Sequence, residues 1–251
     1  ARLQNNPNWQ EIEQTLIQAQ QNSQAIANPA LESYALGNLG GFYEYRAWWL
    51  DSRDRRQAES KPLQACQTAQ DCQKKAIRLT SNALLFAQPD KSPQIAYQWQ
   101  WQLGRLWTSQ KDREKAIAFY QQASQTLESV RSDLINLNSD VQFSFRDRVE
   151  PLYRQLIDLL LVVENNPPTD TKDLTTQALK VIDFLRLSEL ENFLQCSLAP
   201  QLQLETVVGE IDPQAAFIYP LILADRLEII YKLPQQPLAH RAVAIDSTEI
   251  E

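Results

Sequence analysis

The sequence predicts a mainly α-helical fold, a superhelix of stacked helical hairpins followed by a short C-terminal β meander. Three observations support this fold class. The 251 residues include only 5 glycines beside abundant Gln, Leu and Ala, which is a helix-forming composition. Small and large side chains recur at fixed offsets in the stretch from Ala96 to Leu127, and again upstream. After Pro200 the chain turns to β-branched and aromatic residues, which favour strands.

Apolar residues at three- and four-residue steps predict the helices in chain order. The first helix ends near Asn28-Pro29 and looks like a helix that has lost its partner. Pro151 is expected either in the first turn of a later helix or at a kink within it, and Asp173 can cap the helix that follows it. The expected helices are Trp9–Ile26, Leu31–Leu50, Asp71–Gln88, a pair within Ala96–Leu127, Val141–Glu164 and Leu174–Leu198, with a turn at Asn136–Asp140 and a linker at Asn165–Asp173.

The helix over Leu31–Leu50 combines an apolar stripe with three internal glycines. The stripe consists of Leu36, Leu39, Phe42, Tyr43, Trp48 and Trp49. Glycine inside a helix costs up to about 1 kcal/mol relative to alanine. Gly37, Gly40 and Gly41 therefore suggest a second helix pressed against this backbone. The charged stretch that follows, Asp51–Lys61, is expected to be a solvated extension or loop and not a basic binding patch.

The offsets around Leu103-Gly104 match the spacing of a tetratricopeptide repeat, W-x2-L-G-x2-Y…A-x3-F. Trp107, Ala116, Tyr120 and Ala123 continue the pattern, with Gln100 in place of its first Trp and Glu128 in place of its final Pro. Small residues let two antiparallel helices approach, while the large ones fill the space between pairs. A generic helical bundle with chance spacings is the alternative.

A second copy lies upstream, and a third is more divergent. The upstream copy reads Leu39-Gly40, Tyr43, Ala76, Thr80 and Ala83. Its inter-helix loop carries an insertion that holds the charged stretch and both Cys66 and Cys72, so these residues are expected at the surface. Leu174–Leu194 is the candidate second helix of a third pair, with Ala178 as its clear signature residue.

Strands are expected over Ala215–Pro234, with a turn at Ala224-Asp225-Arg226, and over Leu238–Ile245. The sequence stops before these strands are expected to form a complete sheet. Unpaired strand edges invite pairing with another chain, so self-association through this region is expected.

The two nearby cysteines leave three states open. On a continuous helix, Cys66 and Cys72 would have Cα atoms about 9 Å apart, beyond the limit of roughly 7 Å for a disulfide. They can therefore bridge only if the segment bends, and free thiols are the alternative. Zinc is disfavoured because no second Cys pair or His is near. Free thiols favour the cytoplasm, whereas a bridge favours export.

Charge and hydropathy exclude some function classes. A formal net charge of −7 disfavours nucleic acid as a partner. No apolar run reaches the roughly 18 residues of a membrane span, so a soluble chain is expected. No cofactor or metal site is predicted. The sequence begins with Ala1 and contains no Met, so a processed chain or an excised piece is expected.

With these residues in view, the chain resembles the cyanobacterial proteins in which tetratricopeptide repeats precede a CHAT domain, a caspase-like module. The blocks that carry the resemblance are Phe143–Leu161, Gln177–Leu198 and Ala215–Pro234, beside the repeats. It covers nearly the whole chain except Arg53–Cys72. The resemblance implies a helical array over residues 1–199 and, over residues 200–251, the junction and first strands of a truncated CHAT domain.

Protease activity is not expected from this sequence. The resemblance implies a His and Cys dyad well beyond these first strands, and His240 does not match its position. A His240-Cys196 dyad has no support, since Cys196 follows Phe193 and Leu194 on an apolar face and is expected to be a packed thiol.

Clusters of charged residues give no enzymatic reading either. Glu189 and Glu191 are two apart and point to different sides of a helix, so they form no acid and base pair, and Glu189 is expected in a polar network. A basic group could bind an anion, but interleaved acids favour internal ion pairing. That group comprises Arg146, Arg148 and Arg154, with Asp147, Glu150 and Asp158 between them.

The predicted function is a protein-protein interaction module that binds a peptide or a partner domain. By position in the resembled repeats, the first helix of each pair lines the concave side. The predicted contact residues are Tyr34, Glu44, Tyr45, Gln98, Trp101, Arg105 and Thr108. In the intact protein the array would regulate the caspase-like domain. The alternative is a purely architectural or oligomerisation segment.

Overall fold

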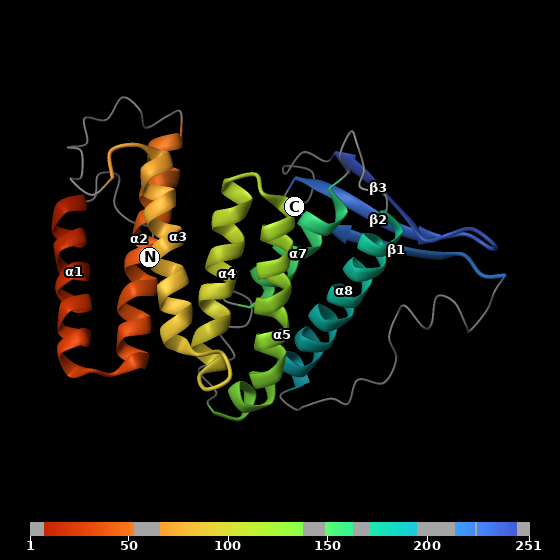
Figure 1. Ribbon diagram of the computed structural model, residues 1–251. Coiled ribbons are helices and arrows are strands. Elements are labelled where there is room, and N and C mark those ends of the chain that lie inside the picture. The colour runs from red at the N-terminus through yellow and green to blue at the C-terminus, as the bar shows by residue number, and fades with distance from the viewer. Residues whose placement is uncertain are drawn as a thin grey trace. The chain divides into compact units, whose positions relative to one another are not determined.

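The computed structural model describes residues 8–52, 66–137, 149–162, 171–194, 214–223 and 225–244 (Figure 1). Within these residues the chain is mainly helical and has one three-stranded sheet near its C-terminus. This confirms the predicted mainly α fold with a C-terminal β meander. The chain divides into two compact units, Ala1–Val130 and Arg131–Glu251.

The first unit contains the helices α1 (Trp9–Ile26), α2 (Pro29–Asp51), α3 (Ala69–Ala87), α4 (Pro93–Ser109) and α5 (Arg113–Leu137), the last of which runs past Val130. Side chains that cap free backbone N–H groups set where three of them begin. Asn8, Asn28 and Thr68 accept hydrogen bonds from the first turns of α1, α2 and α3. Because Thr68 caps α3, this helix starts two residues before the predicted Asp71.

Neighbouring helices of this unit run in alternating directions. Ser33 of α2 bonds Ala83 of α3, while Gly40 faces Ala76, so α2 and α3 are antiparallel. On α4, Trp99 bonds Ser33 and Arg105 bonds Glu44, so α4 runs parallel to α2. Gln24 pairs with Glu32 and Glu13 with Tyr43, which makes α1 antiparallel to α2.

Three glycines mark the closest helix approaches, in agreement with the sequence expectation. A Cβ on Gly37 would lie 2.4 Å from the Trp99 ring, and one on Gly40 would lie 2.5 Å from Thr80 Oγ1. A Cβ on Gly104 would lie 2.7 Å from the Tyr120 ring, which places α5 against α4. Gly40 and Gly104, small residues of the two predicted repeat copies, thus lie where helices touch.

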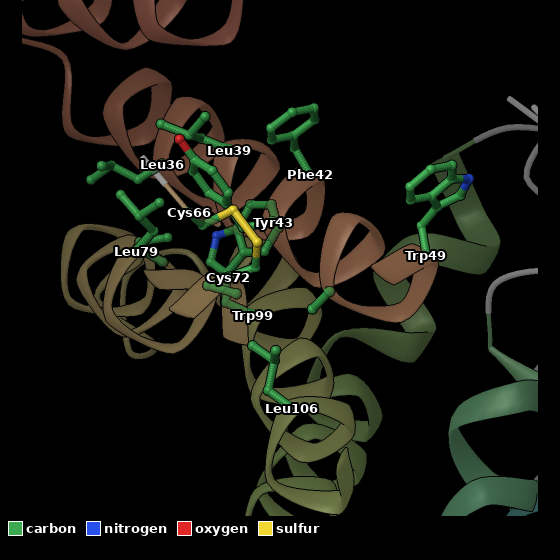
Figure 2. Close-up of a cluster of buried hydrophobic side chains, with 14 of the residues drawn as sticks. Leu36, Leu39, Phe42, Tyr43, Trp49, Cys66, Cys72, Leu79, Trp99 and Leu106 are labelled. Carbon is green, nitrogen blue, oxygen red and sulfur yellow. A yellow bond between two sulfur atoms is a disulfide. The ribbon is translucent and has the colours of Figure 1, made fainter. Parts of the chain in front are cut away.

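The core of this unit gathers aromatic and aliphatic side chains from α1 to α4 (Figure 2). It also contains a disulfide between Cys66 and Cys72, whose Cα atoms are 5.0 Å apart. The bridge is possible because α3 begins at Ala69, so that Cys66 lies before the helix and the chain bends between the two residues.

Two expectations about exposure were wrong. Cys66 and Cys72 are 2% and 0% exposed, so both lie in the core and not at the surface, because Cys72 is on the face of α3 that packs against α2. Trp48, assigned to the apolar stripe, is 53% exposed. Its neighbour Trp49 is buried instead, since successive residues of a helix point about 100° apart.

The second unit contains the helices α7 (Glu150–Leu161) and α8 (Thr171–Leu194), which pack together. Pro151 lies in the first turn of α7, where the absence of an N–H is harmless. Because α8 begins at Thr171, Asp173 lies inside its first turn, and the expectation that it caps the helix was wrong.

The sheet contains β1 (Phe217–Ile222), β2 (Arg226–Lys232) and β3 (Ala239–Ala244) in the order β1-β2-β3, all antiparallel. The inner face includes Leu221, Glu228 and Ile230, which are buried. Pro220 lies in the edge strand β1, a position that tolerates proline and weakens edge pairing with another chain.

Some predicted features lie outside the described residues. They are residues 53–61 of the charged stretch, residues 138–140 of the predicted turn, the segment 141–148 with Arg146, Asp147 and Arg148, most of the linker 165–173, the end of the Leu174–Leu198 helix with Cys196, residues 200–213 of the junction, and Ala224 of the turn between strands.

Candidate functional site

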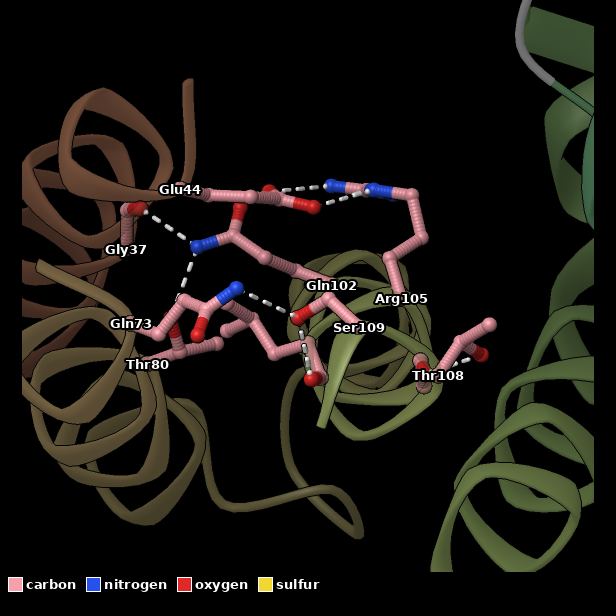
Figure 3. Close-up of polar contacts among 10 residues, drawn as sticks. Gly37, Glu44, Gln73, Thr80, Gln102, Arg105, Thr108 and Ser109 are labelled. Carbon is pink, nitrogen blue, oxygen red and sulfur yellow. Dashed lines mark hydrogen bonds and ion pairs between the residues drawn. The ribbon is translucent and has the colours of Figure 1, made fainter. Parts of the chain in front are cut away.

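Two parallel helices, α2 and α4, bring Glu44, Trp101 and Arg105 together (Figure 3 shows the two charged residues). Arg105 donates from Nε and Nη2 to the two oxygens of Glu44, over 2.7 and 2.9 Å. Its guanidinium also lies 5.1 Å from the centre of the Trp101 ring. Such a two-pronged, charge-assisted contact fixes the orientation of both side chains. Three of the seven predicted contact residues therefore form one cluster.

The Arg105 side chain is partly desolvated yet stays charged. Burial alone would lower the pKa of Arg105, but the hydrogen bonds and charge of Glu44 outweigh that effect and raise it. The side chains of Arg105 and Glu44 remain 32% and 23% exposed. The pair is accordingly fixed in geometry and still open to another molecule.

A polar network below this pair holds α4 against α2 and α3 (Figure 3). The Gln102 amide donates to the Gly37 carbonyl over 3.1 Å and to Thr80 Oγ1 over 2.7 Å. At the other end of the contact, Gln73 of α3 bonds Ser109 and Gln110. Buried amides satisfied in this way specify one register between helices. The positions of Glu44 and Arg105 are therefore set by residues from three helices.

Tyr34 and Tyr45 lie on another face of α2, where they line a groove of about 680 Å³ between α1 and α2. The Tyr34 ring meets Trp99 edge-on at 6.1 Å between centres. Tyr45 stacks on Trp9 at 5.9 Å and lies 5.4 Å from Trp48. These two predicted residues contribute packing as well as surface, and they line a groove that does not include Glu44, Trp101 or Arg105.

The remaining predicted residues, Gln98 and Thr108, bond to their own helix. Gln98 donates to the Gln94 carbonyl and Thr108 to the Gly104 carbonyl. Both lie on α4, Gln98 three residues before Trp101 and Thr108 three residues after Arg105, and their side chains are at least partly exposed. They are thus available at the surface but are not drawn into the Glu44 network.

Sequence reasoning missed most of the groove between α1 and α2. Its lining includes Ile12, Leu16 and Ile26 from α1, spaced at helical intervals, and Leu31 at the start of α2. The available signal was the apolar face of a helix with no partner in the repeat pattern. An unpaired apolar face of this kind indicates a surface that another element or molecule can cover.

In the second unit, a buried carboxylate lies between two partners on the sheet. Glu228 is fully buried and lies 2.7 Å from Arg226 Nε and 3.2 Å from His240 Nδ1. Arg226 also lies 2.6 Å from Asp158 of α7. Burial alone would lower the pKa of Arg226, but these carboxylates raise it. His240 thus has a carboxylate partner within the sheet.

The predicted ion pairing is confirmed for Arg154 and Glu150, whereas Asp158 pairs with Arg226. Arg154 lies 2.5 Å from Glu150 and 4.0 Å from Glu189. Its pair with Arg154 puts Glu189 in a polar network, as expected, and burial together with the charge of Glu150 raises the pKa of Glu189. Glu191, two residues on, is buried. Within the described ranges, no group of three or more His, Cys, Asp or Glu side chains could hold a metal ion.

None of the described helices is long and apolar enough to cross a membrane. Comparison with known proteins gave no match to any protein-family profile, to any curated protein or to any solved structure.

Proposed function

We propose that this chain is a protein-protein interaction module of the tetratricopeptide-repeat kind, which binds a peptide or a partner domain. The binding residues are those on the first helix of each pair, α2 and α4. They are Tyr34, Glu44, Tyr45, Gln98, Trp101, Arg105 and Thr108.

One observation carries the proposal. The parallel helices α2 and α4 present a charged pair, Glu44 and Arg105. The hydrogen bonds of Gln102 hold the two helices in register beneath this pair, and the pair itself is partly open to solvent. Trp101 adds an aromatic surface against the guanidinium. Rigid aromatic and Arg side chains are the residues that most often dominate binding energy at interfaces. A partner with a carboxylate or a backbone carbonyl can share the donors of Arg105.

The helix arrangement supports the repeat assignment. Each hairpin is antiparallel, and α4 packs against both helices of the preceding hairpin through Gly37, Thr80 and Gln102. This is the relation by which hairpins stack into a solenoid with a continuous core. In the intact protein, the resemblance to repeat proteins with a CHAT domain suggests that partner binding regulates that domain.

Selection from a displayed peptide library tests the proposal. The full chain should select peptides whose binding is weakened about tenfold or more by Trp101→Ala or Arg105→Ala, since each removes a central contact. Lys74→Ala, an exposed change on α3, is the matched control and should leave the affinity unchanged. Failure to select any peptide, or affinities indifferent to both α4 variants, would argue against the proposal.

A specific observation also favours the second candidate, an architectural or self-associating segment. One face of the sheet is apolar and open, with Ile218, Ile222 and Val243 being 65%, 51% and 42% exposed. Exposed apolar patches commonly mark association surfaces. Light scattering of the full chain should then show oligomers that the triple change of these residues to Ser dissociates, while Trp101→Ala leaves them intact.

A further inference from the structure

The groove between α1 and α2 is an apolar surface whose lining residues are unusually exposed. Ile26, Leu31 and Tyr34 are 62%, 45% and 39% exposed, and all three line it. Ala19 also lines it and takes up little space. Small residues between larger apolar ones let a helix axis come close, as at the α2 contact with α4. The surface therefore has the shape and chemistry to receive a helix.

The first unit contains an internal precedent for this use. The antiparallel hairpin of α2 and α3 receives a third helix, α4, which runs parallel to α2 and inserts Trp99 next to Gly37. The hairpin of α1 and α2 is antiparallel in the same way. A further helix could pack against α2 in the same way that α2 packs against α4. Such a helix would lie in the groove, parallel to α2 and antiparallel to α1.

The charges near the groove indicate what such a helix would carry. The helix α1 contains Glu11 and Glu13 and no Lys, Arg or His, and the single basic residue of α2, Arg46, is buried. Glu11 adjoins the lining residue Ile12, and Glu32 adjoins Leu31. Because α1 and α2 are antiparallel, Glu11 and Glu32 lie near opposite ends of the α1–α2 pair, beside the groove and not among its lining residues. Opposite charges at both ends of a ligand would complement them.

We propose that the α1–α2 groove binds an amphipathic helix of a partner protein, with an apolar face toward the groove and Lys or Arg residues at both ends. This proposal rests on the proposed function of the chain as an interaction module and specifies the chemistry of a partner. It concerns α1 and α2 alone, so it can fail while the Trp101 and Arg105 surface still binds its own ligand.

The test uses two labelled synthetic helical peptides of 18 residues, equal in length to α1. Both have the same Leu face, and they differ in having Lys or Glu at both ends. Fluorescence anisotropy with the full chain should show the Lys peptide binding at least tenfold more tightly. Raising the salt from 50 to 500 mM should reduce that preference, since it rests on exposed charges, by an amount on the order of severalfold.

Three variants separate this site from general attraction to an acidic protein. The double change Ile26→Ser and Leu31→Ser should weaken the Lys peptide at least tenfold. Leu85→Ser, which changes a 73% exposed leucine on α3 outside the groove, should leave it unchanged. Glu11→Lys with Glu32→Lys should reverse the preference toward the Glu peptide.

Either of two results would overturn the proposal. One is that the two peptides bind equally or not at all up to millimolar concentration, and the other is that the Ile26 and Leu31 double variant binds like the unchanged chain. Library peptides that depend on Trp101 but ignore Ile26 and Leu31 would in that case preserve the proposed function while this inference fails. Conversely, a Lys peptide lost only in the groove variants supports the inference even if the Trp101 surface selects nothing.

Discussion

The indole of Trp99 occupies the space that a side chain on Gly37 would need. A Cβ on Gly37 would lie 2.4 Å from the ring, well inside contact distance. The Trp99 Nε1 donates to Ser33 Oγ over 2.9 Å, and that hydroxyl donates to the Ala83 carbonyl over 2.7 Å. The absence of a side chain on Gly37 thus lets α4 pack closely against α2, and the hydrogen bonds connect both helices to α3.

Gly37→Ala should therefore destabilise the first unit. Alanine gains up to about 1 kcal/mol in helix propensity, but overpacking against a buried ring costs about 1–3 kcal/mol or more, so a net loss is expected. Gly41→Ala is the control, because its Cβ would meet only the Gln102 side chain, at 3.2 Å. Urea unfolding followed by Trp fluorescence measures both, since all 6 tryptophans lie in α1, α2 and α4. Equal stability of the two variants would contradict this packing.

The pair of Glu44 and Arg105 should couple measurably but modestly. A double-mutant cycle with Glu44→Ala and Arg105→Ala should give a coupling free energy of about 0.5–1.5 kcal/mol, above that of most exposed pairs because the contact is two-pronged. Arg105→Lys should lose most of it, since an ammonium cannot make both hydrogen bonds in one plane. A coupling near zero at low salt would show that the pair does not form in solution.

The sequence predicted the helices of the first unit because their apolar periodicity, caps and small residues agree. Gly37, Gly40 and Gly104 were informative because glycine in a helix needs a reason, and close packing supplies it. The sheet was predictable from β-branched and aromatic runs on either side of Asp225.

Side-chain partners between helices were not predictable from spacing alone. Spacing placed Glu44 and Arg105 on the first helices of the two predicted repeat copies, but their contact depends on the register between α2 and α4, which Gln102 sets through Gly37 and Thr80. Both cysteines were assigned to a surface insertion, but Cys72 belongs to the buried face of α3 and the disulfide holds Cys66 beside it in the core.

The disulfide should stabilise the first unit and leave one cysteine reactive. A loop of six residues predicts a contribution of about 2 kcal/mol from restriction of the unfolded chain. The double change Cys66→Ala and Cys72→Ala should lower stability by about that amount, and dithiothreitol should destabilise the unchanged chain but not the variant. Thiol titration in denaturant should detect one of the 3 cysteines without reductant and all 3 with it. Three reactive thiols before reduction would rule the bridge out.

Tyr43 links α1 to the core through its hydroxyl. The hydroxyl donates to Glu13, and burial together with that carboxylate raises the pKa of Tyr43 far above its usual value. Tyr43→Phe leaves the buried Glu13 without this donor and should cost about 1–3 kcal/mol. Tyr45→Phe keeps the stacking on Trp9 and should change stability by less than about 0.5 kcal/mol. Similar losses in both variants would mean that the hydroxyl of Tyr43 contributes little.

Asp112 should make the stability of the first unit depend on pH in the acidic range. Its carboxylate accepts from the Lys115 side chain over 2.7 Å and from the Lys115 backbone N–H over 3.1 Å, just before α5 begins. The Lys115 side-chain bond and then the backbone bond lower the pKa of Asp112 below its usual 3.8. A lowered folded-state pKa means that the stabilisation is complete above the unfolded-state value and is lost as the pH falls through the folded-state value.

The denaturant midpoint of the unchanged chain should accordingly drop more between pH 6 and pH 3 than that of Asp112→Asn. The asparagine keeps an oxygen for the helix cap but cannot be protonated in this range. Lys115→Met should remove most of the same difference, because the Lys115 side chain is the largest cause of the lowered pKa. If the pH curves of the unchanged chain and Asp112→Asn run parallel, the carboxylate does not interact with the start of α5 in the folded state.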